Sequence, residues 1–435
     1  MKIGVISLGC VKNRVDTEQM LSMLTDAGHE FTPDPAEAEI IIVNTCGFID
    51  PAKEESIQTI LEMSEYKKTG RCRKLIVTGC LAQRYGDALL SDMPEIDALL
   101  GVSQYDRIAE AVALAAAGQR PDYRERKSAM LECGRVLTTP AYSAYVRIGE
   151  GCDNRCAYCA IPLIRGGYRS RDEGAILEEA CRLAANGAKE LILISQDTTR
   201  YGRDNGKSLA GLIGRVSALP GVEWLRALYM YPDETSVALL EEMAKRENVC
   251  RYLDLPLQHA SDRLLRAMNR RGTIAQAEAL LARAREMGFT LRTTFIVGFP
   301  GETEEDFSEL MDFTRRMRFD RMGAFAYSAE EDTPGASMPD QVPEEIKQER
   351  LDRLMALQAG ISRELNEKRV GSACRVLVTG FEDGFYTGRS AMEAPDSDGM
   401  IYFTAGRELT PGEFVSVRVA RADTYDLYGI MEGEP

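Results

Sequence analysis

Three cysteines lie close together near the middle of the chain, separated by three residues and then by two. They are Cys152, Cys156 and Cys159. Thiolates bind soft metals and iron–sulfur clusters, and three closely spaced thiolates can hold three irons of a cubane. No fourth cysteine follows nearby, so one iron would keep an open position, and open positions on metals are where substrates react. The spacing therefore predicts a catalytic iron–sulfur cluster.

A zinc knuckle is the alternative for these three cysteines. Structural zinc needs a fourth Cys or His ligand close in sequence. The only histidines of the chain, His29 and His259, are both remote from the cysteine group. We therefore favour the iron–sulfur cluster.

Three more cysteines occur near the N-terminus at nearly equal intervals: Cys10, Cys46 and Cys80. Each follows a short apolar run that is typical of a β-strand. In parallel α/β sheets the carboxyl ends of the strands meet at one edge, where ligands bind. We therefore expect the three thiols to converge and to hold a second cluster with an open iron. The alternative is three buried thiols, because free cysteine often packs in the core.

The elements around these cysteines form three segments. In residues 1–125, short apolar strands alternate with helical patterns, which favours a doubly wound βαβ sheet. Residues 138–368 contain six strand–helix repeats, which predict a partial (β/α)6 barrel with its functional groups at the carboxyl ends of the strands. Residues 370–435 alternate β-rich runs with Gly and Pro turns, which predicts a small antiparallel β-barrel. The fold class is therefore α/β, and the charged stretch at 118–137 is interpreted as a linker.

The central cysteine loop, with Tyr158 before its last cysteine and a strand-like run at 145–148 ahead of it, resembles the cluster motif of the radical S-adenosylmethionine (SAM) superfamily. This resemblance implies a 4Fe–4S cluster whose open iron chelates SAM, and cleavage of SAM to a 5′-deoxyadenosyl radical. It also implies that the ends of the barrel strands surround SAM. The predicted contacts are Tyr158, Gln196 and Gly298.

A three-cysteine segment ahead of this motif is similar to the methylthiotransferase family, and the resemblance covers essentially the whole chain. It implies two 4Fe–4S clusters and the insertion of a methylthio group at an unactivated C–H bond. By resemblance, the ligands of the auxiliary cluster and then of the SAM-cleaving cluster are Cys10, Cys46 and Cys80, and Cys152, Cys156 and Cys159. No catalytic side chain beyond these ligands is predicted, and the C-terminal barrel resembles a TRAM domain.

Two types of this family differ in substrate. One type modifies an adenosine of tRNA, and the other modifies the β-carbon of an aspartate in small-subunit ribosomal protein twelve. This sequence is similar to the second type around Cys10 and Cys46, at 196–199 and at 292–302, and at 47–49 it has Gly-Phe-Ile where the tRNA type usually has Ser and charged residues. The alternatives are a tRNA adenosine methylthiotransferase and a non-catalytic iron–sulfur factor of ribosome assembly.

The chain is acidic, with a formal net charge of −15. Residues 371–435 alone contain five Arg, no Lys and eleven Asp or Glu, which gives −6. Nucleic-acid affinity depends on Lys and Arg at phosphates, so we expect a cationic protein partner, and nucleic acid only indirectly. The alternative is an acidic surface that serves solubility.

The sequence contains no apolar run of membrane-spanning length, and its first residues are typical of a strand instead of a signal peptide. We therefore expect a cytoplasmic protein with reduced cysteines and no membrane partner. An electron donor such as flavodoxin or ferredoxin is the further partner that the resemblance implies.

Three arginines, Arg165, Arg169 and Arg171, follow the central cysteine loop. Two interpretations are open for them. They form a solvated basic loop, or they bind a carboxylate of SAM or of the substrate, because Arg suits bidentate carboxylate binding. His259, near a strand end, is more typical of a structural residue than of a catalytic one.

Overall fold

The computed structural model describes residues 1–127 and 129–433. The chain divides into two compact units, each assembled from separate stretches. The first unit comprises Met1–Thr139, Arg147–Ala175 and Ser328–Ala336, and the second comprises Pro140–Val146, Ile176–Tyr327 and Ser337–Pro435. Among the described residues, no helix combines the length and the apolar character that crossing a bilayer requires.

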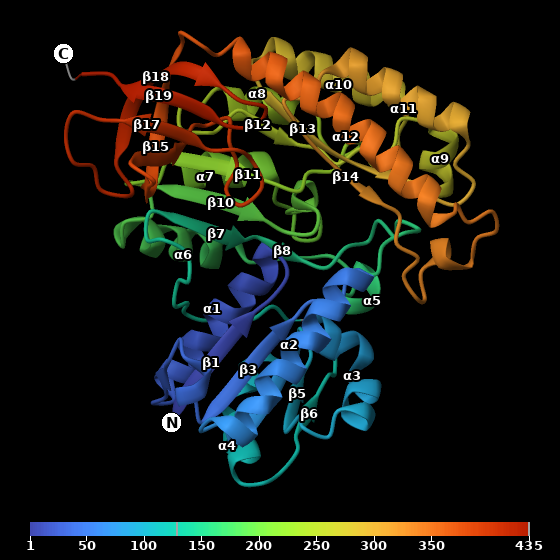
Figure 1. Ribbon diagram of the computed structural model, residues 1–435. Coiled ribbons are helices and arrows are strands. Elements are labelled where there is room, and N and C mark those ends of the chain that lie inside the picture. The colour runs from blue at the N-terminus through green and yellow to red at the C-terminus, as the bar shows by residue number, and fades with distance from the viewer. Residues whose placement is uncertain (128, 434–435) are drawn as a thin grey trace. The chain divides into compact units, whose positions relative to one another are not determined.

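A six-stranded parallel sheet forms the centre of the first unit (Figure 1). Its strand order is β2-β1-β3-β4-β5-β6. In that order, the strands are Glu30–Phe31, Lys2–Ser7, Ile40–Thr45, Lys74–Gly79, Ala98–Leu100 and Asp122–Tyr123. This arrangement confirms the doubly wound sheet predicted from the alternating pattern.

Helices cover both faces of this sheet because successive strand residues point to opposite sides. Ile40 and Ile42 pack in one core with α1 (Val11–Asp26) and α4 (Ile108–Ala116). Ile41 and Val43 pack in the other core with α2 (Asp50–Thr69) and α3 (Cys80–Asp92). Strands buried on both faces have nearly continuous apolar sequences, and residues 40–43 are an example.

The first unit also contains the central cysteine loop. This loop lies between β8 (Gly149–Glu150) and α5 (Ile161–Arg165), and β8 pairs with β9 (Arg169–Ser170) in an antiparallel ribbon. The interpretation of 118–137 as a linker is wrong for Asp122–Tyr123, because β6 pairs with β5 and completes the sheet edge. Ser128, in the same stretch, lies outside the described residues.

The second unit contains two three-stranded sheets, β11-β10-β7 and β12-β13-β14. A parallel bridge between Leu225 and Val249 joins them. The result is a six-stranded arc in chain order, which confirms the partial barrel. The strands are β7 (Ser143–Arg147), β10 (Glu190–Ile194), β11 (Trp224–Ala227), β12 (Tyr252–Asp254), β13 (Thr290–Val297) and β14 (Arg321–Ala326).

Helices connect these strands on the outside of the arc (Figure 1). They are α6 (Glu173–Ala185), α7 (Leu209–Ser217), α8 (Val237–Ala244), α9 (Asp262–Ala267), α10 (Ile274–Glu286) and α11 (Glu304–Met317), followed by α12 (Glu344–Glu367). The last of these packs against β14 and α11. Helix α7 forms although it contains Gly211 and Gly214, and glycine is a weak helix former.

A closed barrel of five strands follows α12, in the order β15-β16-β17-β19-β18. The strands are β15 (Ala373–Glu382), β16 (Phe385–Arg389), β17 (Ile401–Thr404), β18 (Phe414–Ala422) and β19 (Leu427–Met431). Four described pairs are antiparallel, as predicted, whereas β17 and β19 pair in parallel. Alternating apolar residues such as Val376 and Val378 fill the interior.

Candidate metal centre

The strand order of the first unit reverses between β1 and β3. The chain leaves β1 for β2 at one edge and returns to β3 on the other side of β1. Ligands of open α/β sheets bind at such reversals, outside the carboxyl ends of the strands. Cys10 follows β1, Cys46 follows β3, and Cys80 follows β4 directly as the first residue of α3. The three N-terminal cysteines therefore lie along one edge, which we call the cysteine edge.

The three thiols of the cysteine edge are close enough to affect one another. Burial raises the pKa of Cys80 to about 12, and the neighbouring Cys10 and Cys46 contribute to the increase while Arg165 opposes it. Burial also raises the pKa of Cys46, again with a contribution from Cys10. Cys10 is exposed, whereas Cys46 and Cys80 are buried. Iron binding takes the thiolate form, so at the two buried thiols a bound cation is favoured over a bare thiolate.

Glycine makes the close approach of these loops possible. Gly9 has a φ of +81°, and a Cβ on it would lie 2.7 Å from Cβ and 3.0 Å from Sγ of Cys46. Gly79 has a φ of +99°, and a Cβ there would lie 2.4 Å from the carbonyl oxygen of Thr45. Both positions therefore need glycine for conformation and for space.

Asn13, fully buried in the first turn of α1, links the strand ends of the cysteine edge. Its Nδ2 donates to the carbonyl oxygens of Leu8 at 3.1 Å and Thr45 at 2.9 Å. Its Oδ1 accepts hydrogen bonds from Arg165 at 2.7 Å and from the Cys80 thiol at 3.5 Å. One amide thus fixes the ends of β1 and β3 relative to Cys80.

Two arginines and two carboxylates form a buried ion-pair cluster beside the cysteine edge. Arg165 contacts Asp16 at 2.8 Å and Glu150 at 3.0 Å. Arg147 contacts the same Glu150 at 3.0 Å and also pairs with Asp16. Buried charges require such pairing because desolvation is otherwise costly. We call this set, Asp16, Arg147, Glu150 and Arg165, the edge cluster.

These contacts correct both interpretations for two of the three arginines that follow the cysteine loop, whereas Arg169 is half-buried and donates to the carbonyl of Gly167 at 3.3 Å. Arg165 and Arg171 are only 3% and 4% exposed, so the solvated-loop interpretation is wrong for them. Each binds carboxylates, as the other interpretation required, but they belong to the protein itself. Arg171 holds Glu132 with a bidentate contact, in which Nε lies 2.8 Å from Oε1 and Nη2 lies 2.6 Å from Oε2.

No role is predicted from the sequence for Asn13, Asp16, Arg147 or Glu150, although the sequence pattern contains a signal for three of them. Arg147 interrupts an apolar strand, and Asn13 and Asp16 follow Cys10 by three and six residues, which places them near one another on the first turns of a helix. Their common partner, Arg165, is remote in sequence, so the pattern could not identify it.

The central cysteine loop is held by backbone hydrogen bonds. The N–H of Cys152 donates to the carbonyl of Gly166 at 3.1 Å, and the N–H of Cys159 donates to Cys156 at 3.0 Å. The N–H of Gly335, in the 328–336 segment, donates to the carbonyl of Ala157 at 2.7 Å. The loop therefore has a defined path, in which Cys156 is buried and the other two cysteines, Cys152 and Cys159, are half-buried.

The 328–336 segment also contacts residues next to the cysteine edge. Glu330 is buried and pairs with Lys53 and Arg84, both at 3.0 Å. Arg84 donates in turn to the carbonyl of Gly47 at 3.2 Å, directly after Cys46. One short segment thus touches the surroundings of both cysteine sets, which lie together in the first unit.

The donor chemistry of both cysteine sets fits iron–sulfur clusters. Each set offers three sulfur donors, which suit soft metals. Among the described residues, no group of three or more His, Cys, Asp or Glu side chains is placed to hold a metal ion. In a cubane each thiolate binds a different iron, so the sulfurs need not converge on a single point.

The three predicted SAM contacts lie at the expected positions along the chain. Tyr158 and Gln196 are half-buried, the first in the cysteine loop and the second directly after β10. Gly298 follows β13 with a φ of +73°, but a Cβ on it would lie 2.2 Å from Cγ of Lys347. Its N–H donates to Glu302 at 2.8 Å. This glycine therefore makes room for α12, and contact of the three residues with SAM stays a prediction.

His259 has the surroundings of a structural residue. It is fully buried, and its Nδ1 accepts a hydrogen bond from the N–H of Ser261 at 3.0 Å. Its Nε2 lies 3.4 Å from Glu302, which also accepts from Arg350 at 2.8 Å. The group ties the loop after β12 to the start of α11.

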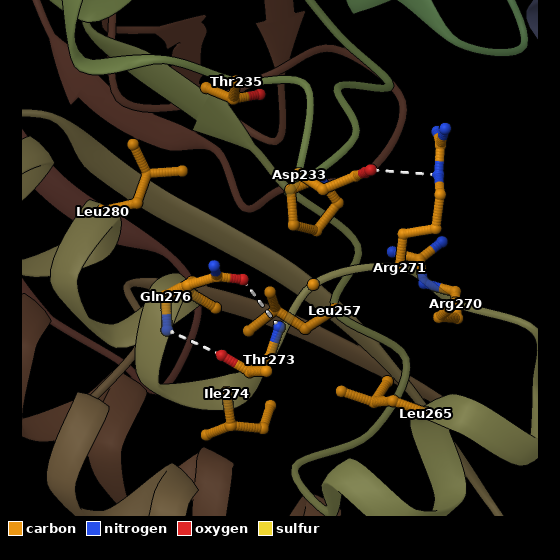
Figure 2. A pocket seen from close by; sticks show the side chains of 13 residues that line it. Asp233, Thr235, Leu257, Leu265, Arg270, Arg271, Thr273, Ile274, Gln276 and Leu280 are labelled. Carbon is orange, nitrogen blue, oxygen red and sulfur yellow. Dashed lines mark hydrogen bonds and ion pairs between the residues drawn. The ribbon is translucent and has the colours of Figure 1, made fainter.

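A cavity of about 340 Å³ opens beside the segments that follow β11 and β12 (Figure 2). Leu257 and Leu265 form part of its wall, and Thr273 and Gln276 cap each other across the start of α10. Arg271 pairs with Asp233 at 3.0 Å at its mouth. Arg270 is a second arginine in the lining of this cavity.

Three family models match the chain. A family described as uncharacterized protein family UPF0004 matches residues 2–101, the radical SAM superfamily matches 146–314, and the TRAM domain matches 370–431. The radical SAM match covers the cysteine loop and most of the partial barrel. Fold and site therefore define a radical SAM enzyme, a class that uses an iron–sulfur cluster and SAM.

Curated relatives narrow the class. The chain is 50% identical to the ribosomal protein uS12 methylthiotransferase RimO of Desulforudis audaxviator, over 98% of this chain and 96% of the relative. It is 49% identical to the protein of that name from Heliobacterium modesticaldum, over 100% and 96%. The chain belongs to the RimO family of ribosomal protein uS12 methylthiotransferases. This confirms the predicted family and type.

Solved structures share the fold at low sequence identity. The radical SAM methyltransferase TsrM from Kitasatospora setae, with tryptophan and a SAM analogue bound, aligns with a TM-score of 0.58 and 13% identity, over 83% of this chain and 89% of that one. The cobalamin-dependent SAM radical enzyme OxsB aligns with a TM-score of 0.52 and 12% identity, over 82% and 56%. At such identities the likeness concerns the fold alone.

Proposed function

We propose that this protein replaces a hydrogen on the β-carbon of an aspartate in ribosomal protein uS12 with a methylthio group. The observation that carries the proposal is the pair of three-cysteine sets within one compact unit. Each set leaves a fourth iron without a protein ligand, as a reacting centre requires. The names of the relatives supply the protein substrate.

In this proposal Cys10, Cys46 and Cys80 hold an auxiliary 4Fe–4S cluster, and the central loop holds the SAM-cleaving one through Cys152, Cys156 and Cys159. When bound, the clusters and SAM would supply a 5′-deoxyadenosyl radical, sulfur and a methyl group. The protein contributes positioning and the exclusion of water. Tyr158, Gln196 and Gly298 are the proposed SAM contacts.

The charge of the C-terminal barrel supports a cationic protein substrate. Each of the five arginines in the described part of this barrel forms an ion pair with a carboxylate: Arg375, Arg389, Arg407, Arg418 and Arg421. Phosphate binding relies on available Lys and Arg. An RNA substrate would therefore have to break these pairs, whereas a basic protein would not.

The hairpin between β15 and β16 is the most exposed apolar part of the barrel. Phe381 is 64% exposed and Phe385 is 37% exposed, and the exposed Glu382 and Asp383 lie between them. Aromatic groups beside acidic ones suit contact with Lys and Arg side chains through charge and cation–π interactions. We propose this hairpin as part of the surface that meets the basic substrate.

The proposal includes the organisation expected from the sequence. The domains are 1–125, 138–368 and 370–435, with the protein in the cytoplasm and an electron donor such as flavodoxin or ferredoxin. In this division of labour, the cysteine edge and the central cysteine loop would carry the chemistry. The barrel of residues 370–435 would carry substrate recognition.

Mass spectrometry of uS12 tests the proposal. Cells with the gene should contain uS12 whose aspartate is heavier by one methylthio group in place of hydrogen, and cells with a Cys156→Ala gene should not. The purified protein with SAM and a reductant should release 5′-deoxyadenosine. A mass change confined to a tRNA nucleoside would point to the tRNA type, and absence of both products from the iron-loaded protein would point to an assembly factor.

A further inference from the structure

We propose that Arg165 is a positioning residue for the auxiliary cluster. Its guanidinium donates to the sulfur of Cys80, fixes that ligand and makes the cluster easier to reduce. This inference rests on the proposed function, which assigns Cys80 to a cluster. It adds a residue outside the two cysteine sets to the machinery and predicts a property that can be measured without turnover.

The geometry at Arg165 is fully specified by buried partners. Nη2 lies 3.6 Å from Sγ of Cys80, 2.7 Å from Oδ1 of Asn13 and 2.8 Å from Oδ2 of Asp16. Nη1 lies 3.0 Å from Oε1 of Glu150. The side chain is 1% exposed, so little water competes for the sulfur. Because the oxygens hold the planar guanidinium in place, its contact with Cys80 is preorganised.

The charges of the edge cluster explain why the contact with sulfur matters. Asp16 and Glu150 balance the charges of Arg147 and Arg165, so the edge cluster has no net positive charge. The edge cluster therefore stabilises a thiolate of the iron–sulfur cluster through a directed N–H donor. Hydrogen bonds to ligating sulfurs favour the more negative, reduced state and raise the reduction potential.

Arg165 also belongs to the loop of the other cysteine set. It is the last residue of α5, which begins two residues after Cys159. The residue that follows it, Gly166, accepts the backbone hydrogen bond from Cys152. Ala160 and Ile164 of the same stretch pack with Cys80 in one apolar cluster. The side chain of Arg165 thus connects the auxiliary ligand Cys80 to the backbone that carries the SAM-cleaving set.

Arg147 provides a matched control. It pairs with the same two carboxylates as Arg165 and donates to Oε1 of Gln19 at 2.6 Å, and it is likewise buried. Among the described contacts of the auxiliary cysteines, only the guanidinium of Arg165 donates to a sulfur. Replacing either arginine by Met removes a similar volume and the same type of ion pair, but only one replacement removes the donor to Cys80.

The experiment uses the full chain with Cys152, Cys156 and Cys159 replaced by Ala, so that only the auxiliary cluster remains. Into this background are placed Arg165→Met, Arg165→Lys and Arg147→Met. Circular dichroism checks the fold, iron and sulfide analysis measures cluster content, and a redox titration followed by electron paramagnetic resonance measures the midpoint potential.

We expect Arg165→Met to shift the potential to a more negative value than Arg147→Met does, and Arg165→Lys to recover part of the shift by keeping a cationic donor. Loss of the cluster from Arg165→Met alone, with normal circular dichroism, would equally support a role in fixing Cys80. Equal potentials, or equal cluster loss, in the two Met variants would overturn the inference while leaving the proposed function intact. A background protein that binds no iron would overturn both.

Discussion

Two buried thiols in this protein each lie within electrostatic reach of a buried arginine, and their surroundings differ in an instructive way. Cys80, on the cysteine edge of the first unit, receives a direct contact from Arg165 and has two other thiols nearby. Cys250 lies just before β12 in the second unit, and the charge of Arg226 lowers its pKa through space. Burial raises the pKa of both thiols, to about 12 and about 11 respectively.

The partners of the two arginines explain the difference. Arg226 donates to Glu190 at 3.2 Å, and Glu190 also accepts from Arg389 of β16 at 2.6 Å. We call this set, Glu190, Arg226 and Arg389, the barrel-contact cluster, because it joins the partial barrel to the C-terminal barrel. Its described hydrogen bonds all go to oxygen, whereas the edge cluster also reaches a sulfur. Similar buried ion pairs thus serve attachment in one unit and, in our proposal, the positioning of a cluster ligand in the other.

The largest expected effect comes from removing one thiol of each pair. Cys80→Ala should abolish methylthiolation and lower the iron content, because three thiolates are needed to hold a cubane with one open iron. Cys250→Ala, the matched control, removes a thiol that is equally buried and should keep activity and iron at the wild-type level. Full activity in Cys80→Ala, measured by mass spectrometry of uS12, would contradict the assignment.

The next largest effect is expected when a substitution breaks the barrel-contact cluster. Glu190→Gln leaves two buried guanidiniums without their shared carboxylate, which costs about 3–5 kcal/mol of unfolding free energy. Trp224, the single tryptophan of the chain, reports on this region because its ring lies edge-on to Phe414 of β18, with centroids 4.8 Å apart. Denaturant unfolding followed by tryptophan fluorescence measures the loss. Ser143→Ala, which removes only one 3.0 Å hydrogen bond to Glu190, should cost about 1 kcal/mol.

The sequence predicts the parts of this structure that depend on local patterns, and it does not predict the edge cluster or the barrel-contact cluster. The doubly wound sheet, the six-strand arc and the cysteine edge are all local in origin, since each depends on a periodic apolar run and on the residue that follows it. Very short strands have no such run, because β2 and β6 each contain only two residues. Strands of that length are defined by their neighbours and not by their own pattern.

Partners that are remote in sequence could not be predicted. The contact between Arg165 and Cys80 spans 85 positions, and that between Arg389 and Glu190 spans 199. Gly298 gives a clear case, since the sequence does not reveal that a Cβ at this position would meet Lys347 of α12. Sequence pattern identifies where polar groups gather, and packing decides which groups meet.

Acid should loosen the barrel contact. Burial alone would raise the pKa of Glu190, but the charges of Arg389 and Arg226 outweigh the effect of burial and lower the pKa to about 2. The charges of Arg369 and Arg321 likewise outweigh burial at Glu393 and lower its pKa to about 2. With unfolded values near 4.3, each group contributes stability that is complete above about pH 5 and is lost as the pH falls toward 2, by about 3 kcal/mol at most.

Denaturant unfolding of the wild-type protein at a series of pH values, followed by Trp224, measures this loss. Glu393→Gln should show a smaller loss between pH 5 and 2 than the wild-type protein, because one of the carboxylates with a lowered pKa is gone. An unchanged pH dependence in that variant would remove Glu393 from the account.

The smallest expected effect separates backbone conformation from crowding at the cysteine edge. Gly9 and Gly28 have nearly the same φ, +81° and +79°, but a Cβ on Gly28 would meet no atom within 4 Å, whereas one on Gly9 would lie 2.7 Å from the Cβ of Cys46. Gly28→Ala should therefore cost only the left-handed conformation, about 1–2 kcal/mol. Gly9→Ala should cost that much in conformation, and it should also displace Cys46 and reduce the iron content after reconstitution. Equal iron in the two variants would mean that the cysteine edge can move without losing its ligands, and then the close packing around Cys46 would serve stability and not the metal centre.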